Sequence, residues 1–344
     1  MAETVRLALM GFGNVGQAFA RLLLEKESKL LERYDLIFKV TGVTTFRHGT
    51  AIADAGLDLQ ALLDAQAQER SLSELDESSF KGDSFSFLRA CPADVLIETT
   101  PVNPQSGQPA LDHIREALMQ GWHAVTANKG PVVYGYERLN RIAAARGLRF
   151  MFESAVMDGA PIFSLFRAPL AGAKLLGFEG ILNSCTNLLL ERMEAGESLE
   201  EAIAYGASIG ITETDPSNDV DGWDASIKVA ALATVLMDHP LTPLEVDRTG
   251  IRGISPAMIA EAKAAGERWK LVCTGGWQDG EFLARVHPQR VGPDSPFYTV
   301  SGTSSFVTFH LDVLPGLGIL ESDPSPKTTA FGLLADLLYI YRNS

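Results

Sequence analysis

The first half of the chain alternates short apolar runs with longer stretches in which apolar residues recur every three or four positions. The short runs predict buried strands and the longer stretches predict helices. The predicted strands are 5–10, 38–44, 93–101, 123–127 and 148–155, and the predicted helices are 17–31, 59–69, 109–120 and 136–146. This alternation indicates an α/β fold with a doubly wound parallel sheet, which binds ligands at the carboxyl ends of its strands.

A glycine-rich turn, Gly-Phe-Gly-Asn-Val-Gly at 11–16, joins the first predicted strand to the first predicted helix. In this context Gly11 permits a tight turn, Gly13 lets the backbone approach a pyrophosphate, and Gly16 lets helix and strand pack closely. The helix N-terminus then faces the phosphates. We therefore expect a Rossmann-type nucleotide-binding domain; the alternative is a tight turn that binds no nucleotide.

The pattern changes after about residue 156. Strand-like runs at 176–182, 282–291 and 304–311 are separated by helical stretches, which indicates a second domain of the α+β type. We assign 1–155 to the nucleotide-binding domain, completed by a C-terminal helical segment from about 315 to 344. The segment 156–314 is assigned to a substrate-binding and dimerisation domain.

The end of the second predicted strand bears on the choice of cofactor. An Asp or Glu there would bind the ribose 2′-hydroxyl of NAD. The sequence instead continues Thr-Thr-Phe-Arg-His from Thr44 to His48. Because Arg47 can pair with a 2′-phosphate, we expect NADP to be preferred over NAD. The alternative for Arg47 is an ordinary solvated loop residue.

An acidic loop followed by a lysine marks the second half. The run Asp-Pro-Ser-Asn-Asp-Val-Asp-Gly-Trp-Asp-Ala-Ser-Ile-Lys spans 215–228. Asp224 and Lys228 are four residues apart, so a helix places both on one face. The chain beyond Lys228 is apolar, and a lysine where such a helix becomes buried needs carboxylates to hold it. This arrangement suits a proton donor beside carboxylates that bind a cationic substrate. The alternative is a capped helix with one ion pair.

Composition narrows the class. The chain has 344 residues and a formal net charge of -14, which argues against nucleic acid or an anionic membrane as a partner. Cys91, Cys185 and Cys273 are far apart, as in proteins of a reducing compartment. The N-terminus lacks a signal-peptide pattern, and the apolar run 229–237 is too short to span a membrane. We expect a cytoplasmic protein with a small-molecule substrate.

These motifs resemble those of the homoserine dehydrogenase family, in the short form without a regulatory domain. The resemblance covers essentially the whole chain. Its most specific carrier is the 215–228 run, and the others are the glycine-rich turn, Thr-Ala-Asn-Lys-Gly-Pro at 126–131, Glu153, Asn-Ser-Cys-Thr-Asn at 183–187, Glu213, Arg-Val-His-Pro at 285–288 and Pro-Gly-Leu-Gly at 315–318. The family interconverts L-aspartate 4-semialdehyde and L-homoserine with NAD(P)H, a step in threonine and methionine biosynthesis.

The resemblance implies roles for individual residues. Lys228 would be the general acid and base, and Lys129 the second lysine of the site. The residues implied to bind substrate are Glu213, Asp219 and Asp224. Those implied or expected to bind the cofactor are Gly11, Phe12, Gly13, Asn14, Val15, Gly16, Arg47, Thr100, Lys129 and Gly318.

The resemblance also implies a monovalent cation, sodium, beside the hinge between the domains. Its ligands would be the Glu153 side chain and the backbone carbonyls of Val156, Asp158 and Ala160. A structural role is the alternative for Glu153, as it is for Lys129. The Met-Asp-Gly sequence at 157–159 departs from the glycine-rich stretch that is usual in the family.

Three alternative functions remain open. Cys185 lies in a Ser-Cys-Thr-Asn segment similar to the nucleophile segment of phosphorylating aldehyde dehydrogenases, which would oxidise an aldehyde through a thioester. The chemistry could instead act on another small hydroxy amino acid or semialdehyde, because residues 319–326 also depart from the family pattern. A nucleotide-binding regulator without activity is a third alternative.

We expect a homodimer built through the second domain. The strand-like runs 282–291 and 304–311 carry apolar residues on a small sheet, and an exposed sheet face or edge must be covered. Pairing two such sheets about a two-fold axis covers both.

Overall fold

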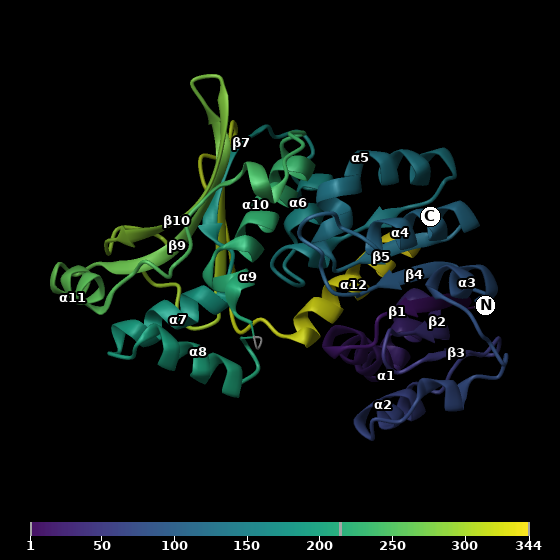
Figure 1. The fold of residues 1–344 in the computed structure, drawn as a ribbon. Coiled ribbons are helices and arrows are strands. Elements are labelled where there is room, and N and C mark those ends of the chain that lie inside the picture. Colours follow the sequence, from purple (N-terminus) through teal and green to yellow (C-terminus); the bar gives the residue numbers. More distant parts are fainter. Residues whose placement is uncertain (1, 213–214, 343–344) are drawn as a thin grey trace. The chain divides into compact units, whose positions relative to one another are not determined.

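The computed structural model describes residues 2–212 and 215–342, which form two compact units (Figure 1). Met1–Pro161 and Ser325–Ser344 make up one, called the N-terminal unit below, and Ile162–Pro324 makes up the other, called the central unit. Among the described residues, none of the helices has both the length and the apolar character that crossing a membrane requires.

The N-terminal unit contains a six-stranded sheet in the order β3-β2-β1-β4-β5-β6. Its strands are β1 (Glu3–Met10), β2 (Leu36–Thr44), β3 (Thr50–Ile52), β4 (Val95–Glu98), β5 (His123–Thr126) and β6 (Phe150–Met151). All pairs are parallel except β2 with β3, an antiparallel edge strand that the sequence pattern did not predict. The predicted doubly wound α/β fold is thus confirmed.

Helices cover both faces of this sheet (Figure 1). They are α1 (Asn14–Tyr34), α2 (Leu59–Ala67), α3 (Ser84–Ala90), α4 (Ala110–Gln120), α5 (Lys129–Ala145) and α12 (Pro326–Arg342), with short 3₁₀ turns η1 (Leu72–Leu75) and η2 (Glu153–Ala155). Phe19 of α1 and Leu333 and Leu337 of α12 are fully buried in one core with the apolar residues of β1. Burial of this apolar stripe is the reason that a helix so late in the chain belongs to the N-terminal unit.

The central unit contains a second six-stranded sheet in the order β12-β11-β7-β9-β10-β8. Its strands are β7 (Leu175–Ile181), β8 (Asp247–Arg248), β9 (Arg268–Gln278), β10 (Glu281–Val291), β11 (Ser305–Leu311) and β12 (Leu317–Glu321). Its helices are α6 (Ile162–Arg167), α7 (Ser184–Glu194), α8 (Leu199–Ser208), α9 (Ser217–Val220), α10 (Trp223–Leu236) and α11 (Pro256–Ala264), with the 3₁₀ turn η3 (Pro243–Glu245). Helices α7, α10 and α11 pack against β9.

The return of the chain to the N-terminal unit lies later than the sequence indicated. We expected residues from about 315 onward to complete the nucleotide-binding domain. Instead β12 pairs antiparallel with β11 in the central sheet, and the N-terminal unit resumes at Ser325. The backbone pairing of β12 explains this difference, because five residue pairs from Ser305–Glu321 to Phe309–Leu317 hold the segment to β11.

Candidate active site

The glycine-rich turn lies between β1 and α1, as predicted. Gly11 has φ 95°, and a Cβ there would lie 2.8 Å from the backbone oxygen of Thr99. A Cβ at Gly13 would meet nothing within 4 Å, and no side chain caps the start of α1. The open space above Gly13 and the uncapped helix start, where Asn14 and Val15 lie, fit the pyrophosphate of a dinucleotide.

Other residues of this turn have supporting roles. A Cβ at Gly16 would lie 2.8 Å from the Gly11 oxygen, so only glycine permits this approach of the helix to the turn. Phe12 is 2% exposed, with its side chain in the core. The Gln17 side chain donates to the Phe12 carbonyl over 3.3 Å.

The β2–β3 turn contains Arg47, the residue expected to bind the 2′-phosphate. Thr44 ends β2, and its hydroxyl is 2.7 Å from that of Thr50 across the hairpin. Arg47 is exposed at this turn, beside the fully exposed Phe46. An exposed guanidinium without a neighbouring carboxylate in the turn can reach a phosphate, but its role stays a prediction.

The ends of β4 and β5 bring Thr100 and Lys129 to the same edge of the sheet. Lys129 is the first residue of α5, and the side chain of Asn128 caps that helix by accepting from the Gly130 N–H over 2.9 Å. The Asn128 side chain also donates to the Thr100 carbonyl over 3.1 Å. Thr100 in turn donates its N–H to Glu98 over 2.9 Å.

Glu98 is a functional candidate that sequence reasoning missed. It is 0% exposed, and burial raises the pKa of its carboxyl group above the ordinary value, although hydrogen bonds from Thr100 and Thr126 oppose the shift. The available signal was a lone carboxylate that ends an otherwise apolar strand. Such a residue is expensive to bury unless its oxygens have donors.

The central unit brings the predicted lysine and carboxylates together. Lys228 Nζ lies 3.0 Å from Asp224 Oδ2 and donates to the backbone oxygen of Leu182 over 2.6 Å. The Asn183 side chain donates to Asp219 over 2.7 Å and to Asp224 over 3.0 Å. We call these four side chains the lysine–carboxylate cluster: Asn183, Asp219, Asp224 and Lys228.

Asn183 is the member of the cluster to which sequence reasoning gave no role. Its side-chain oxygen accepts from the Thr186 N–H over 2.7 Å and so caps α7. Because that oxygen is fixed by the helix, the amide nitrogen must point at the two carboxylates. One residue thereby starts a helix and orients the acidic pair.

Electrostatics of the cluster favour a cationic ligand. Burial, and secondarily the neighbouring Asp224 charge, raise the pKa of Asp219 above its ordinary value. The described cluster holds two carboxylates and one ammonium group, so a second cation would relieve the repulsion between the carboxylates. Glu213, the third predicted substrate carboxylate, lies outside the described residues. Lys129 belongs to the N-terminal unit and Lys228 to the central unit.

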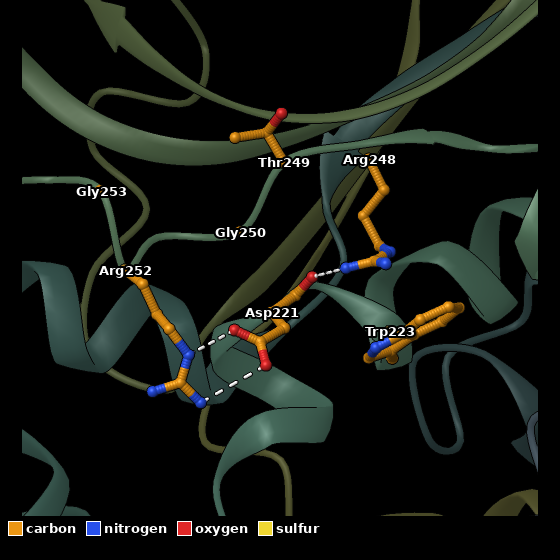
Figure 2. A pocket seen from close by; sticks show the side chains of 7 residues that line it. All are labelled: Asp221, Trp223, Arg248, Thr249, Gly250, Arg252 and Gly253. Carbon is orange, nitrogen blue, oxygen red and sulfur yellow. Dashed lines mark hydrogen bonds and ion pairs between the residues drawn. The ribbon is translucent and has the colours of Figure 1, made fainter.

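An arginine pocket borders the acidic loop (Figure 2). It has a volume of about 420 Å³ and is lined by Asp221, Trp223, Arg248, Thr249, Gly250, Arg252 and Gly253. Figure 2 shows the Asp221 carboxylate turned toward Arg252, whose Nε is 2.5 Å away, while Arg248 donates to the Asp221 carbonyl. Arg248 also stacks 3.7 Å above the Trp223 ring. Asp221 thus anchors the loop, whereas Asp219 and Asp224 belong to the cluster.

Gly318 lies in a different part of the fold from the one that the sequence indicated. We expected it in a loop on the cofactor side of the nucleotide-binding domain. It is instead in β12 of the central sheet, paired with Thr308, and a Cβ there would lie 2.7 Å from the Phe306 ring. Close packing against this ring explains a glycine at the position.

Two of the residues expected around sodium, Asp158 and Glu153, contact α12. Both oxygens of the Asp158 carboxylate accept hydrogen bonds, from Thr328 over 2.9 Å and from Thr329 over 3.0 Å. The Asp158 backbone oxygen lies 3.0 Å from the position of a Cβ on Gly332, so it faces α12. The buried Glu153 donates its N–H to Asp336 over 2.8 Å. The ligand set that includes Val156 and Ala160 stays a prediction.

Cys185 is unsuited to act as a nucleophile. Its side chain is 4% exposed, and burial, with a further contribution from Asp219, raises the pKa of the thiol to about 12. A nucleophilic cysteine needs the opposite shift. A thioester mechanism would also need a histidine base beside the thiol. The histidines of the central unit have other neighbours, because His239 stacks on Phe282, His287 lies 3.1 Å from Asp247 and His310 lies 3.3 Å from Glu179.

The glycine-rich turn and the lysine–carboxylate cluster define a nicotinamide-dependent oxidoreductase. Sequence comparison supports this class in both units. A sequence model described as the homoserine dehydrogenase NAD-binding domain matches residues 11–153, and one described as homoserine dehydrogenase matches residues 161–338. The chain belongs to the homoserine dehydrogenase family and is an NAD(P)-dependent dehydrogenase.

Similar proteins share almost the whole chain. The NAD(+)-dependent homoserine dehydrogenase of Pseudomonas canavaninivorans is 33% identical over 340 residues, covering 98% of this chain and 97% of its own. The homoserine dehydrogenase of Methanocaldococcus jannaschii is 34% identical over 339 residues, covering 98% and 99%. The structure of a hyperthermophilic archaeal homoserine dehydrogenase in complex with NADPH has a TM-score of 0.83 and 26% identity, covering 99% of each chain.

Replacing Cys185 with Ser tests the aldehyde-oxidising alternative. A buried, protonated thiol is dispensable for hydride transfer, so the variant should keep at least about a third of the wild-type activity. Initial rates with aspartate 4-semialdehyde and NADPH measure this. Cys91→Ser is the matched control, because burial also raises the pKa of that thiol to about 12. A selective loss of all activity in the Cys185 variant, with a thioester trapped in the wild type, would favour the aldehyde-oxidising enzyme.

Proposed function

We propose that this chain interconverts L-aspartate 4-semialdehyde and L-homoserine, with Lys228 as the general acid and base. The observation that carries the proposal is the lysine–carboxylate cluster. Its Lys228 side chain is 15% exposed and has Asp224 at 3.0 Å, so an ammonium group is held at the edge of an apolar helix where substrate has access. The family membership supplies the substrate pair.

In the reductive direction, the hydride for the carbonyl carbon of the semialdehyde would come from reduced nicotinamide, whose pyrophosphate the glycine-rich turn would hold. Lys228 gives a proton from Nζ to the carbonyl oxygen, which becomes the hydroxyl group of homoserine. In the oxidative direction the neutral amine takes the hydroxyl proton. The contacts of Nζ with Asp224 and the Leu182 carbonyl fix its position during both steps.

Asp219 and Asp224 bind the α-ammonium group that semialdehyde and homoserine share. The raised pKa of Asp219 supports this role, because a substrate cation would compensate the second negative charge. Glu213 is proposed as a further substrate carboxylate. Lys129 is proposed to polarise the carbonyl group, since it lies beside Thr100 at the strand ends where a Rossmann-type sheet binds the reactive end of its cofactor.

The substrate assignment has an alternative within the same chemistry. Another small hydroxy amino acid or semialdehyde would also present an ammonium group to Asp219 and Asp224. A spectrophotometric panel of aldehydes and keto acids with NADPH separates the two, and preference for a compound other than aspartate 4-semialdehyde would replace the assignment.

NADP is the proposed cofactor in preference to NAD. The support is a β2 end with a hydroxyl in place of a carboxylate, followed by the exposed Arg47. The NADPH complex of the archaeal structure is compatible with this preference, whereas the Pseudomonas relative is named as NAD(+)-dependent. Arg47 is therefore the residue to test.

A homodimer through the central sheet is also proposed. Apolar side chains remain exposed on this sheet, among them Leu176 at 45%, Trp277 at 53% and Leu320 at 59%. A hollow of about 350 Å³ lies on β7, β9 and β10, lined in part by Leu176, Trp277 and Leu283. A second copy supplies the matching apolar surface.

Replacing Lys228 with Ala should lower kcat by about 10²-fold or more, because a positioned general acid contributes that much. Cofactor binding should survive, since the glycine-rich turn is in the other unit. Steady-state rates and NADPH titration by fluorescence measure the two effects. Lys263→Ala, on α11, is the control and should keep normal rates. Near-normal turnover of the Lys228 variant would refute its role as the acid.

Replacing Arg47 with Ala should weaken NADPH about tenfold or more in Kd and leave NADH nearly unchanged, because only NADPH loses a charge-assisted phosphate contact. Isothermal titration with both cofactors measures this. Arg141→Ala, which removes an exposed arginine from α5, is the control. Equal losses for both cofactors, or a wild type that prefers NADH, would contradict the assignment.

Light scattering at micromolar concentration should give about twice the chain mass of 37.1 kDa. Replacing Trp277 with Glu should shift the protein toward the monomer, because a charge on the covered face must be desolvated. Leu244→Glu is the control, since Leu244 is 70% exposed on η3. A wild type that is strictly monomeric would exclude this interface.

A further inference from the structure

Strand β4 ends in Glu98, a carboxylate that the proposed mechanism does not use. Glu98 is 0% exposed and cannot touch solvent, yet it lies between the two loops that carry Thr100 and Lys129. A carboxyl group this deeply buried is costly unless its oxygens are satisfied. Its partners therefore indicate what the residue does.

One carboxyl oxygen of Glu98 holds the loop after β4. The Thr100 N–H donates to Oε1 over 2.9 Å, and the Thr100 hydroxyl donates to the same oxygen. These two bonds fold the Thr100 backbone and side chain back onto the strand end. The same loop contacts the glycine-rich turn, because the Thr99 hydroxyl donates to the Gly11 carbonyl over 3.1 Å.

The other carboxyl oxygen holds the loop after β5. The Thr126 hydroxyl lies 2.7 Å from Glu98 Oε2, and it accepts the Asn128 N–H over 2.9 Å. Asn128 in turn caps α5, the helix that begins at Lys129, and donates to the Thr100 carbonyl. The hydrogen bonds thus form a closed path from Thr100 through Glu98, Thr126 and Asn128 back to Thr100.

We infer that Glu98 is a positioning residue, whose buried carboxyl group fixes the loop of Thr100 relative to the start of α5 and thereby places Lys129 for catalysis. The inference rests on the proposed function, because it takes Lys129 as part of the catalytic site. Glu98 acts only through these neighbours. A displacement of about 1 Å in such a group is enough to slow catalysis about 10²-fold.

The geometry predicts which substitutions of Glu98 preserve its hydrogen bonds to both loops. Burial raises the pKa of Glu98, which favours the neutral acid, and a neutral acid can donate from Oε2 to Thr126 while Oε1 accepts from Thr100. Glutamine reproduces this pattern, with its amide oxygen toward Thr100 and its NH₂ toward Thr126. The Thr126 hydroxyl can then donate to the Glu98 backbone carbonyl, which is 3.2 Å away. Alanine provides neither contact.

Kinetics of the full chain test the inference. Glu98→Gln should keep at least about half of the wild-type kcat, and Glu98→Ala should lose about 10- to 100-fold. A double-mutant cycle with Lys129→Ala adds the decisive readout. Because Glu98 acts through Lys129, Glu98→Ala should cost less than about twofold in kcat when Lys129 is already absent.

Two further variants serve as a substitute for Glu98→Ala and as a control. Thr126→Val breaks the same path from the β5 side with little change of volume, and replaces Glu98→Ala in the cycle if that variant does not fold. Thr41→Val is the matched control, because it removes a buried hydroxyl that donates to the Pro92 carbonyl over 2.7 Å, away from both loops. It should lower the melting temperature without changing kcat.

The outcomes separate this inference from the proposed function. Wild-type turnover of Lys129→Ala would overturn the role of Lys129, and the positioning role with it. An impaired Lys129→Ala with the same Glu98→Ala loss in both backgrounds would overturn the positioning role alone. Equal losses for Glu98→Gln and Glu98→Ala would also overturn it, because glutamine retains the hydrogen-bond pattern through which Glu98 is inferred to act.

Discussion

The charge of Lys228 at the buried start of α10 is the constraint that organises the central unit. Ala225, Ile227 and Val229 around it are buried, so the ammonium group depends on protein acceptors. The acceptors come from the end of β7, at Leu182, and from Asp224 within the helix. These two contacts hold the end of β7 and the start of α10 together.

The acidic loop is held to the start of α7 through the Asn183 side chain. Asn183 bonds both Asp219 and Asp224, and repulsion between these carboxylates contributes to the raised pKa of Asp219. An additional cation therefore stabilises the arrangement. Under the proposed function, the ammonium group of the substrate would supply this cation.

Local patterns predicted much of the fold and site. The β1–turn–α1 segment and the pair Asp224 and Lys228 depend on spacing within one element, and sequence spacing shows that directly. Strand β9 was missed because its run contains the buried Lys270 and the pair Gly275 and Gly276, which interrupt the apolar alternation. Lys270 is tolerated because Asn187, far away in sequence, accepts its ammonium proton over 2.7 Å.

Gly318 and Glu98 are two residues whose surroundings could not be predicted from the neighbouring sequence. Gly318 belongs to a glycine pattern typical of a loop, but cross-strand pairing and the Phe306 ring place it in a sheet. Glu98 belongs to no motif, and its partner Thr126 ends β5, 28 residues later. Both depend on contacts between distant segments, which composition and spacing do not encode. The local settings of Gly11 and Lys228 could be predicted because the steric and electrostatic demands on them arise within a few neighbouring residues.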